Sequence, residues 1–147
     1  MARSARDLYY VAVKGFLERN GKLFVFRDRY GDWDLPGGRI QRHEFRTPFE
    51  RVLERKIREE LGRGVRYRLG KPVVFMRHAR REVSRHGQRI RIFAIGYRAA
   101  FHGGEIKLSP QHTEYRWVSL ERFSPRNYFK GGWLAGVQEY LRARKRS

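Results

Sequence analysis

The stretch PGGRIQRHEFRTPFERVLERKIREELG, residues 36–62, decides the fold of this chain. It opens with a proline and two glycines, a composition typical of a tight turn. It then predicts a helix from Pro48 to Leu61, because Thr47 is a suitable N-cap and Glu50, three residues later, completes a capping box. Apolar side chains recur along this helix at helical spacing, and the glycine that follows it is the expected C-cap.

The segments on either side predict strands. Two β-rich runs, residues 9–17 and 23–27, flank Asn20-Gly21, a pair typical of a tight hairpin turn. The order of elements predicts an α/β (α+β) fold, a mixed sheet packed between helices, in a single domain over residues 1–147. Three further strands are expected at residues 67–76, 90–98 and 115–118, and a last, basic helix at residues 132–146.

The composition bounds the class of protein. At 147 residues, with 40% hydrophobic and 14% aromatic content, the chain is long enough to fill one core. The absence of cysteine excludes disulfides, thiolate catalysis and a thiolate zinc site. No apolar run near the N-terminus resembles a signal peptide, and no segment suits a membrane span. We therefore expect a cytoplasmic protein without a membrane partner.

Positive charge dominates the composition. The chain holds 34 Lys and Arg against 15 Asp and Glu, a formal net charge of +19, and arginine outnumbers lysine 27 to 7. The excess is uneven, since residues 1–61 carry a net +4 and residues 62–147 a net +15. Such an excess favours a polyanionic partner, and arginine suits bidentate phosphate contacts and stacking. The alternative is the arginine-rich surface of a thermophile protein, although ion-pair networks need both signs in balance.

A basic hairpin arm is expected at residues 76–91, because this segment lies between two strands and contains a turn-like His86-Gly87. It carries six arginines and one acidic residue, so it can follow a phosphate backbone or enter an RNA groove. A solvated pair of strands is the alternative. A second basic cluster ends the C-terminal helix. The residues predicted to bind RNA are Arg77, Arg80, Arg81, Arg85, Arg89, Arg91, Arg142, Arg144, Lys145 and Arg146.

The opening stretch resembles the Nudix family. The signature of that family is a glycine, five residues, a glutamate, seven residues and then R-E-U-x-E-E-x-G-U, where U is bulky and apolar. The loop Trp-x-Leu-Pro-Gly-Gly before it and the segment TEYRWVSL, residues 113–120, are also similar to the family. The resemblance covers about residues 9–123 and implies a Nudix-like mixed sheet packed between helices. The residues that fit the signature are Gly38, Glu44, Arg55, Ile57, Glu59, Glu60 and Gly62.

Three features depart from this signature. Ten residues, 45–54, separate Glu44 from Arg55 in place of seven, and Arg63 stands at the final apolar position. Lys56 stands where the family has the first glutamate of R-E-U-x-E-E. This third departure matters most, because a lysine removes one negative charge from the cluster and adds a positive one. Two unit charges 4 Å apart interact by roughly 4 kcal/mol at an effective dielectric near 20, so the change opposes a bound cation by several kcal/mol.

The resemblance implies roles for the carboxylates. Nudix enzymes use them to hold divalent ions against a diphosphate, a task for hard oxygen ligands. If the site is active, Glu59 and Glu60 are then metal ligands and catalytic residues, and Glu114 belongs to the region that supplies a catalytic base. The alternative is that Glu59 and Glu60 pair with cations at helical spacing, and that Glu114 has a surface role. The residues of the Nudix loop are Gly37, Gly38 and Glu44.

We interpret the chain as an RNA-binding protein of Nudix-like fold that has lost hydrolase activity and needs no cofactor. Its expected place is a ribosome or another ribonucleoprotein, with ribosomal RNA and neighbouring proteins as partners and no DNA sequence specificity. The alternative is a hydrolase that uses Mg²⁺ or Mn²⁺ to cleave nucleoside diphosphate derivatives or capped RNA ends. Positive charge serves either function, and the fold does not decide between them.

Overall fold

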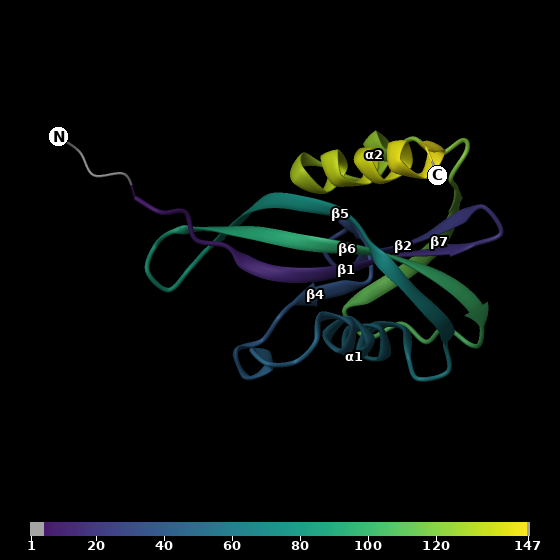
Figure 1. Cartoon of the computed structure of the whole chain (residues 1–147), viewed down its shortest axis with the longest axis horizontal. Coiled ribbons are helices and arrows are strands. Elements are labelled where there is room, and N and C mark those ends of the chain that lie inside the picture. Colours follow the sequence, from purple (N-terminus) through teal and green to yellow (C-terminus); the bar gives the residue numbers. More distant parts are fainter. Residues whose placement is uncertain (1–4, 147) are drawn as a thin grey trace.

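A mixed sheet of seven strands forms the centre of the computed structural model, which describes residues 5–146 (Figure 1). The strands follow the order β3-β2-β1-β6-β5, with β4 paired to β1 and β7 paired to β2. Strands β1 and β6 are parallel, and the other pairs are antiparallel. The strands are β1 (Tyr10–Arg19), β2 (Lys22–Asp28), β3 (Trp33–Asp34), β4 (Gly37–Arg39), β5 (Arg66–Val83), β6 (Arg89–Gly103) and β7 (His112–Ser119).

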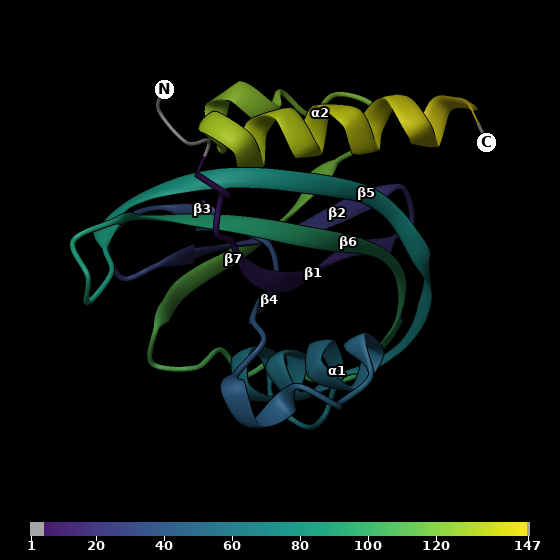
Figure 2. The same cartoon turned by 60° about the vertical axis from the view of Figure 1, so that its left-hand side comes forward.

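Two α-helices, α1 (Phe49–Leu61) and α2 (Gly131–Arg146), cover opposite faces of this sheet (Figures 1 and 2). Short 3₁₀ helices lie at Arg42–Glu44 and Pro125–Asn127. The central strand β1 buries both of its faces: Ala12 and Phe16 belong to the core beneath α2, and Val13 and Leu17 to the core beneath α1. The expected fold class, a mixed sheet packed between helices, is confirmed.

The turn between β1 and β2 forms as the sequence predicts. Asn20 has φ 50° and Gly21 has φ 74°, so both residues adopt the left-handed conformation that the Asn-Gly pair tolerates. The two strands are antiparallel, with Arg19 opposite Lys22. The predicted hairpin is therefore confirmed.

Helix α1 begins differently from the prediction. Pro48 has φ −55° and ψ 143°, so it is extended and precedes the first helical residue as the N-cap in place of Thr47. No side chain caps this end, so Glu50 completes no capping box, and its carboxylate instead lies near the hydroxyl of Tyr97 of β6. The predicted capping box was wrong. The other end is as expected, because Gly62 ends the helix with φ 89° and its N–H donates to a carbonyl in the last turn.

Strands β5 and β6 extend past their neighbours as a two-stranded arm, and the predicted arm segment, residues 76–91, occupies this hairpin (Figure 1). Its turn is at residues 84–88, where Gly87 has φ 77°. Among the described residues, no helix is both long and apolar enough to cross a lipid bilayer. Residues 1–4 and 147 of the expected domain lie outside the part that the structure describes.

Candidate functional site

A cleft of about 340 Å³ opens beside the glycine loop that joins β3 to β4. Its walls come from β1, from the β3–β4 segment, from α1 and from the first turn of α2, and the arm adds one side chain. The lining holds four cationic side chains and one carboxylate, a composition that suits an anionic ligand. The lining residues are Ala12, Lys14, Asp34, Gly37, Gly38, Arg39, Gln41, Lys56, Arg80, Ile92 and Trp133.

Lys14 is a buried cation in this cleft, only 5% exposed. Its Nζ donates hydrogen bonds to both carboxylate oxygens of Asp34, at 2.9 and 3.0 Å, and to the carbonyl oxygen of Leu35 at 3.2 Å. The ammonium also lies 5.3 Å from the centre of the Trp133 ring. A buried charge is stable only with such partners. The fold therefore holds the Lys14–Asp34 ion pair in the wall of the cleft.

Lys56 places its ammonium against the glycine loop. A Cβ atom added to Gly38 would lie 2.6 Å from Cε and 3.2 Å from Nζ of Lys56, so the lysine uses the space that the glycine leaves. Glu59, one turn further along α1, pairs with the ammonium at 3.5 Å. The side chain of Lys56 is 24% exposed, and it lines the cleft. A ligand in the cleft therefore meets this ammonium directly.

Glu60 links the glycine loop to α1 through a hydrogen bond. Its Oε1 accepts a hydrogen bond from the backbone N–H of Gly37 at 2.8 Å, and its Oε2 lies 3.9 Å from Nε2 of His112. Burial raises the pKa of Glu60 to about 7, against the opposing influence of Lys14, the Gly37 N–H and Lys56. Burial also lowers the pKa of His112. Glu60 does not belong to the described residues that line the cleft.

Glu44, Arg55 and Glu59 form a chain of ion pairs that ties the segment before α1 to the helix. Arg55 donates to both carboxylate oxygens of Glu44, at 2.7 Å each, and to Glu59 at 2.9 Å. Glu44 also accepts a hydrogen bond from the backbone N–H of Gln41 at 2.9 Å. The hydrogen bonds from Arg55 hold the pKa of Glu44 below its ordinary value, although burial opposes this. The contacts of Glu59 with Arg55 and Lys56 are the helical pairing that the sequence offered as the alternative to metal binding, whereas Glu60 binds the Gly37 N–H instead of a cation at helical spacing.

In the arrangement that the structure shows, the side chains at this loop do not form a site for Mg²⁺ or Mn²⁺. Both ions need several hard oxygen ligands around one point, and residues 5–146 contain no group of three or more His, Asp or Glu side chains arranged to hold an ion. Glu60 is committed to the loop, and Glu59 is shared by Arg55 and Lys56. Lys56 adds a positive charge where the family signature has a ligand. The charged groups that the cleft presents to a ligand are therefore mainly cationic side chains.

Glu114 lies on β7, outside this cleft. It is partly exposed and pairs with Arg116 at 3.2 Å and with Arg27 at 3.7 Å. It does not belong to the described residues that line the cleft. The fold therefore does not bring it to the ligand position beside Glu59 and Glu60, and its contacts are those of a surface residue.

The residues predicted to bind RNA fall into two groups. Arg80 lines the cleft, and Arg89 and Arg91 line a second cavity at the tip of the arm. The C-terminal group ends α2, where Arg144 pairs with Glu18 of β1 at 2.8 Å. Figures 1 and 2 place this end of α2 and the tip of the arm at opposite ends of the molecule. The remaining predicted residues are exposed: Arg77, Arg81, Arg85, Arg142, Lys145 and Arg146.

Sequence reasoning missed Lys14, Asp34, Arg39 and Trp133 as members of the site. They come from distant parts of the chain, so no local spacing connects them. One signal was present, because Lys14 interrupts the apolar strand VAVKGFL, residues 11–17. A cation in a strand that is buried on both faces is costly unless it is paired. Its presence in such a strand therefore indicates a partner and a functional site.

Comparisons with known proteins agree on the fold. A family model described as the NUDIX domain matches residues 8–135. No curated protein sequence matches the chain. Among solved structures, the MutT protein from Methanosarcina mazei Go1 is 22% identical, with 97% of each chain covered and a TM-score of 0.69. The E. coli ORF135 protein is 23% identical, with 92% of this chain and 91% of that chain covered and a TM-score of 0.69.

A third similar structure is an ADP-ribose pyrophosphatase from Streptococcus suis. It is 16% identical, with 93% of this chain and 92% of that chain covered and a TM-score of 0.66. Identities this low show a shared fold and leave the ligand of this chain to be argued from its own residues.

Proposed function

Because the chain belongs to the Nudix family, we propose that its cleft binds the phosphate groups of a nucleotide derivative without a metal ion. In this proposal the ammonium group of Lys56, with the guanidinium groups of Arg39 and Arg80, supplies the positive charge that divalent ions supply in Nudix enzymes. The ligand class follows from the family, one member of which is the ADP-ribose pyrophosphatase described above. The chain would then be a nucleotide-binding protein and not a hydrolase.

The position of Lys56 carries this proposal. Its ammonium lies beside Gly38 in the lining of the cleft. An ammonium offers three donors to phosphate oxygens and acts as a compact point charge. Its partner Glu59 is about half exposed, so a phosphate can replace that carboxylate without leaving it buried and unpaired.

The other cations of the lining extend the same anion site. Arg39 of β4 and Arg80 of the arm both pair with Glu82, which is itself partly exposed. Guanidinium groups bind phosphate in a bidentate manner. Lys14 is not one of these ligand-binding cations, because its three hydrogen bonds go to Asp34 and Leu35 and the Asp34 carboxylate balances its charge.

A binding assay tests the proposal. ADP-ribose and inorganic pyrophosphate are titrated into the protein in the presence of EDTA, by calorimetry or by the fluorescence of Trp133 at the cleft. We expect binding of both probes, and a loss of at least ~10-fold in affinity in Lys56→Gln, since a hydrogen bond to a charged group contributes about 1.5–3 kcal/mol. Lys22→Gln, at the exposed β1–β2 turn, is the matched control. Absence of binding, or equal affinity of both variants, contradicts the proposal.

Metal-dependent hydrolysis is the second candidate function. Family membership favours it, and so does the retained framework of Glu44, Arg55, Glu59 and Glu60. It would use Mg²⁺ or Mn²⁺ and act on nucleoside diphosphate derivatives or capped RNA ends. The test is product release from a panel of such compounds with either ion, lost in Glu60→Gln. Turnover by the unmodified protein establishes this function, and a silent panel excludes it for those substrates.

A further inference from the structure

The strands at the base of the arm leave one face uncovered. Phe75 of β5 is 61% exposed, and Val11 of β1 is 37% exposed. Figures 1 and 2 show β5 and β6 running past α1 toward the tip of the arm, so this helix does not cover the arm. Contiguous exposed apolar side chains, unlike scattered ones, mark surfaces that bind a partner.

The strand register gathers five side chains on this face. Side chains of directly paired residues point to the same side of a sheet, and so do those two residues apart along one strand. Phe93 of β6 lies opposite Val11 of β1 and opposite Arg77 of β5. Phe75 is two residues from Arg77, and Arg91 is two residues from Phe93. We call this set the aromatic face: Val11, Phe75, Arg77, Arg91 and Phe93.

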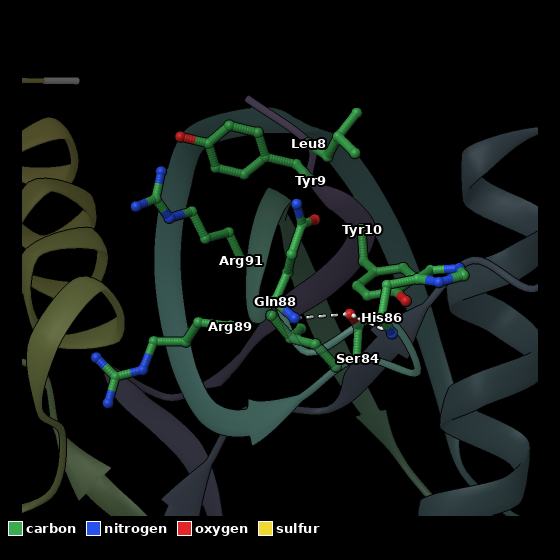
Figure 3. Close-up of a pocket in the computed structure, with 9 residues that line it drawn as sticks. Leu8, Tyr9, Tyr10, Ser84, His86, Gln88, Arg89 and Arg91 are labelled. Atoms are coloured by element: carbon green, nitrogen blue, oxygen red, sulfur yellow. Dashed lines mark hydrogen bonds between the residues drawn. The ribbon is translucent and has the colours of Figure 1, made fainter. Parts of the chain in front are cut away.

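The aromatic face and the cleft lie on opposite sides of the sheet. Ile92, which lines the cleft, lies between Arg91 and Phe93 in β6, so its side chain points away from theirs. Figure 3 shows the same division near the tip of the arm, where Arg89 and Arg91 project to one side of the β1–β6 pair and Tyr10 to the other. A ligand on the aromatic face therefore does not depend on the cleft.

Two stacked rings form the aromatic part of this face. The ring centres of Phe75 and Phe93 are 5.9 Å apart, and the ring planes differ by 22°. Phe93 is partly buried against the core beneath α1, whereas Phe75 is the exposed ring of the pair. A ring that already packs on an anchored neighbour loses little freedom when a ligand stacks on it. The pair therefore presents a preformed platform to solvent.

Two arginines flank this platform. Arg77 is exposed, and none of the ion pairs within residues 5–146 involves it. Arg91 pairs with Asp7 at 2.6 Å, and both side chains of that pair are about half exposed. An exposed pair of this kind contributes little to stability, so a phosphate can compete for Arg91. The aromatic face therefore offers two guanidinium groups to an anionic ligand.

We propose that the aromatic face binds single-stranded nucleic acid, with a base on Phe75 and backbone phosphates on Arg77 and Arg91. Sheet faces that expose aromatic rings beside cations bind single strands in this way, because every base has a flat surface that stacks and the cations follow the backbone. The RNA partner predicted from the six arginines of the arm is the expected ligand class. This site stands whether or not the cleft binds a nucleotide.

Charge favours nucleic acid over a second copy of the chain as the occupant of this face. An exposed apolar face can also pair with itself in a homodimer. The arm carries six arginines and one acidic residue, and the whole chain has a formal net charge of +19, so two copies that meet at this face repel each other. A polyanion is attracted to the same surface. Self-association is therefore the competing outcome of the test.

The test measures fluorescence anisotropy of labelled oligo(U) and oligo(dT) with the full chain. We expect Phe75→Ala to weaken binding by ~10-fold, the effect of losing one stacked base, and Phe75→Tyr to retain it. Arg77→Ala with Arg91→Ala should reduce the magnitude of the slope of log affinity against log salt by about 1.4, since each phosphate contact to a single strand contributes about 0.7. Circular dichroism spectra check that each variant is folded.

Two matched controls separate this face from the rest of the surface. Tyr10→Ala removes an exposed ring from the opposite face of the sheet, and Arg122→Ala with Arg126→Ala removes two exposed cations between β7 and α2. Unchanged affinity in the first control and an unchanged slope in the second support the site, and weaker binding of oligo(dT) than of oligo(U) identifies RNA as the ligand. Equal losses in Phe75→Ala and Tyr10→Ala, equal slope changes in the two double variants, or no binding of either oligonucleotide overturns the proposal. A dimer in sedimentation that Phe75→Ala dissociates, with oligonucleotide affinity unchanged, also overturns it, because the face then binds a second copy.

Discussion

Reversing the charge of Lys56 should create a divalent-ion site beside the glycine loop. In Lys56→Glu, a third carboxylate joins Glu59 and Glu60 at the spacing i, i+3, i+4 on one face of α1. Two unit charges 4 Å apart interact by roughly 4 kcal/mol at an effective dielectric near 20, and the substitution changes two such interactions. Solvent around the 24% exposed side chain, and the ammonium of Lys14 that remains, reduce the gain.

We therefore expect the free energy of Mn²⁺ binding to improve by about 3 kcal/mol, which corresponds to roughly a hundredfold tighter binding. Electron paramagnetic resonance of free Mn²⁺ measures this directly, and the thermal midpoint of the variant should rise when Mn²⁺ is added. Lys56→Met removes the positive charge without adding a carboxylate, so it should give an intermediate affinity. Arg58→Glu makes the same change of charge on the exposed side of α1, away from the cleft, and should bind Mn²⁺ no better than the original protein.

One result would refute this reasoning. If the unmodified protein binds Mn²⁺ as tightly as Lys56→Glu does, the ammonium does not oppose a cation and the cleft is a metal site after all. Equal gains in Lys56→Glu and Arg58→Glu also contradict it, because the effect would then come from the net charge of the protein.

Two further predictions concern the loop and the residue beneath it. Because burial raises the folded-state pKa of Glu60 to about 7 from the ordinary 4.5, the folded protein holds this proton longer than the unfolded chain, and stability falls as pH rises between these values. Denaturant unfolding at pH 5 and pH 8 should show a loss of about 3 kcal/mol from this group, absent in Glu60→Gln; identical pH dependence in both proteins contradicts it. Gly37→Ala should destabilise by more than about 3 kcal/mol, because φ is 132° and the new Cβ would overlap the carbonyl oxygen of Val13, whereas Gly21→Ala, with φ 74° and open space, should cost about 1–2 kcal/mol. Similar thermal midpoints for the two alanine variants would show that the loop relaxes easily.

Local signals located most of the elements in the sequence. The Asn20-Gly21 pair fixed the first hairpin, and the helical spacing of apolar residues placed α1, because each depends only on neighbouring residues. The cap of α1 was misplaced because Thr47 and Glu50 match a local pattern, while a distant residue, Tyr97, engages Glu50 in the fold. A tertiary contact can override a capping pattern of about 1 kcal/mol.

The site was predictable only in part. The family signature drew attention to Lys56 and Glu60, because it spans both the glycine loop and α1, and both residues contact that loop. Lys14 and Trp133 reach the same cleft from β1 and α2, and the sheet topology that brings them together is not encoded in any local spacing. The arm was visible as a run of arginines. The exposure of Tyr10 was not, because it depends on how the N-terminal segment meets the arm.

The metal dependence of ligand binding is the most direct test of the central claim, that the Lys56 ammonium and its neighbouring arginines replace the divalent ion in the cleft. ADP-ribose is titrated by calorimetry into the unmodified protein, once with EDTA and once with millimolar MgCl₂, and the ligand is recovered and analysed after each titration. The account predicts nearly equal affinities and intact ADP-ribose under both conditions. Binding that appears only with Mg²⁺, together with AMP and ribose phosphate in the recovered sample, would contradict it.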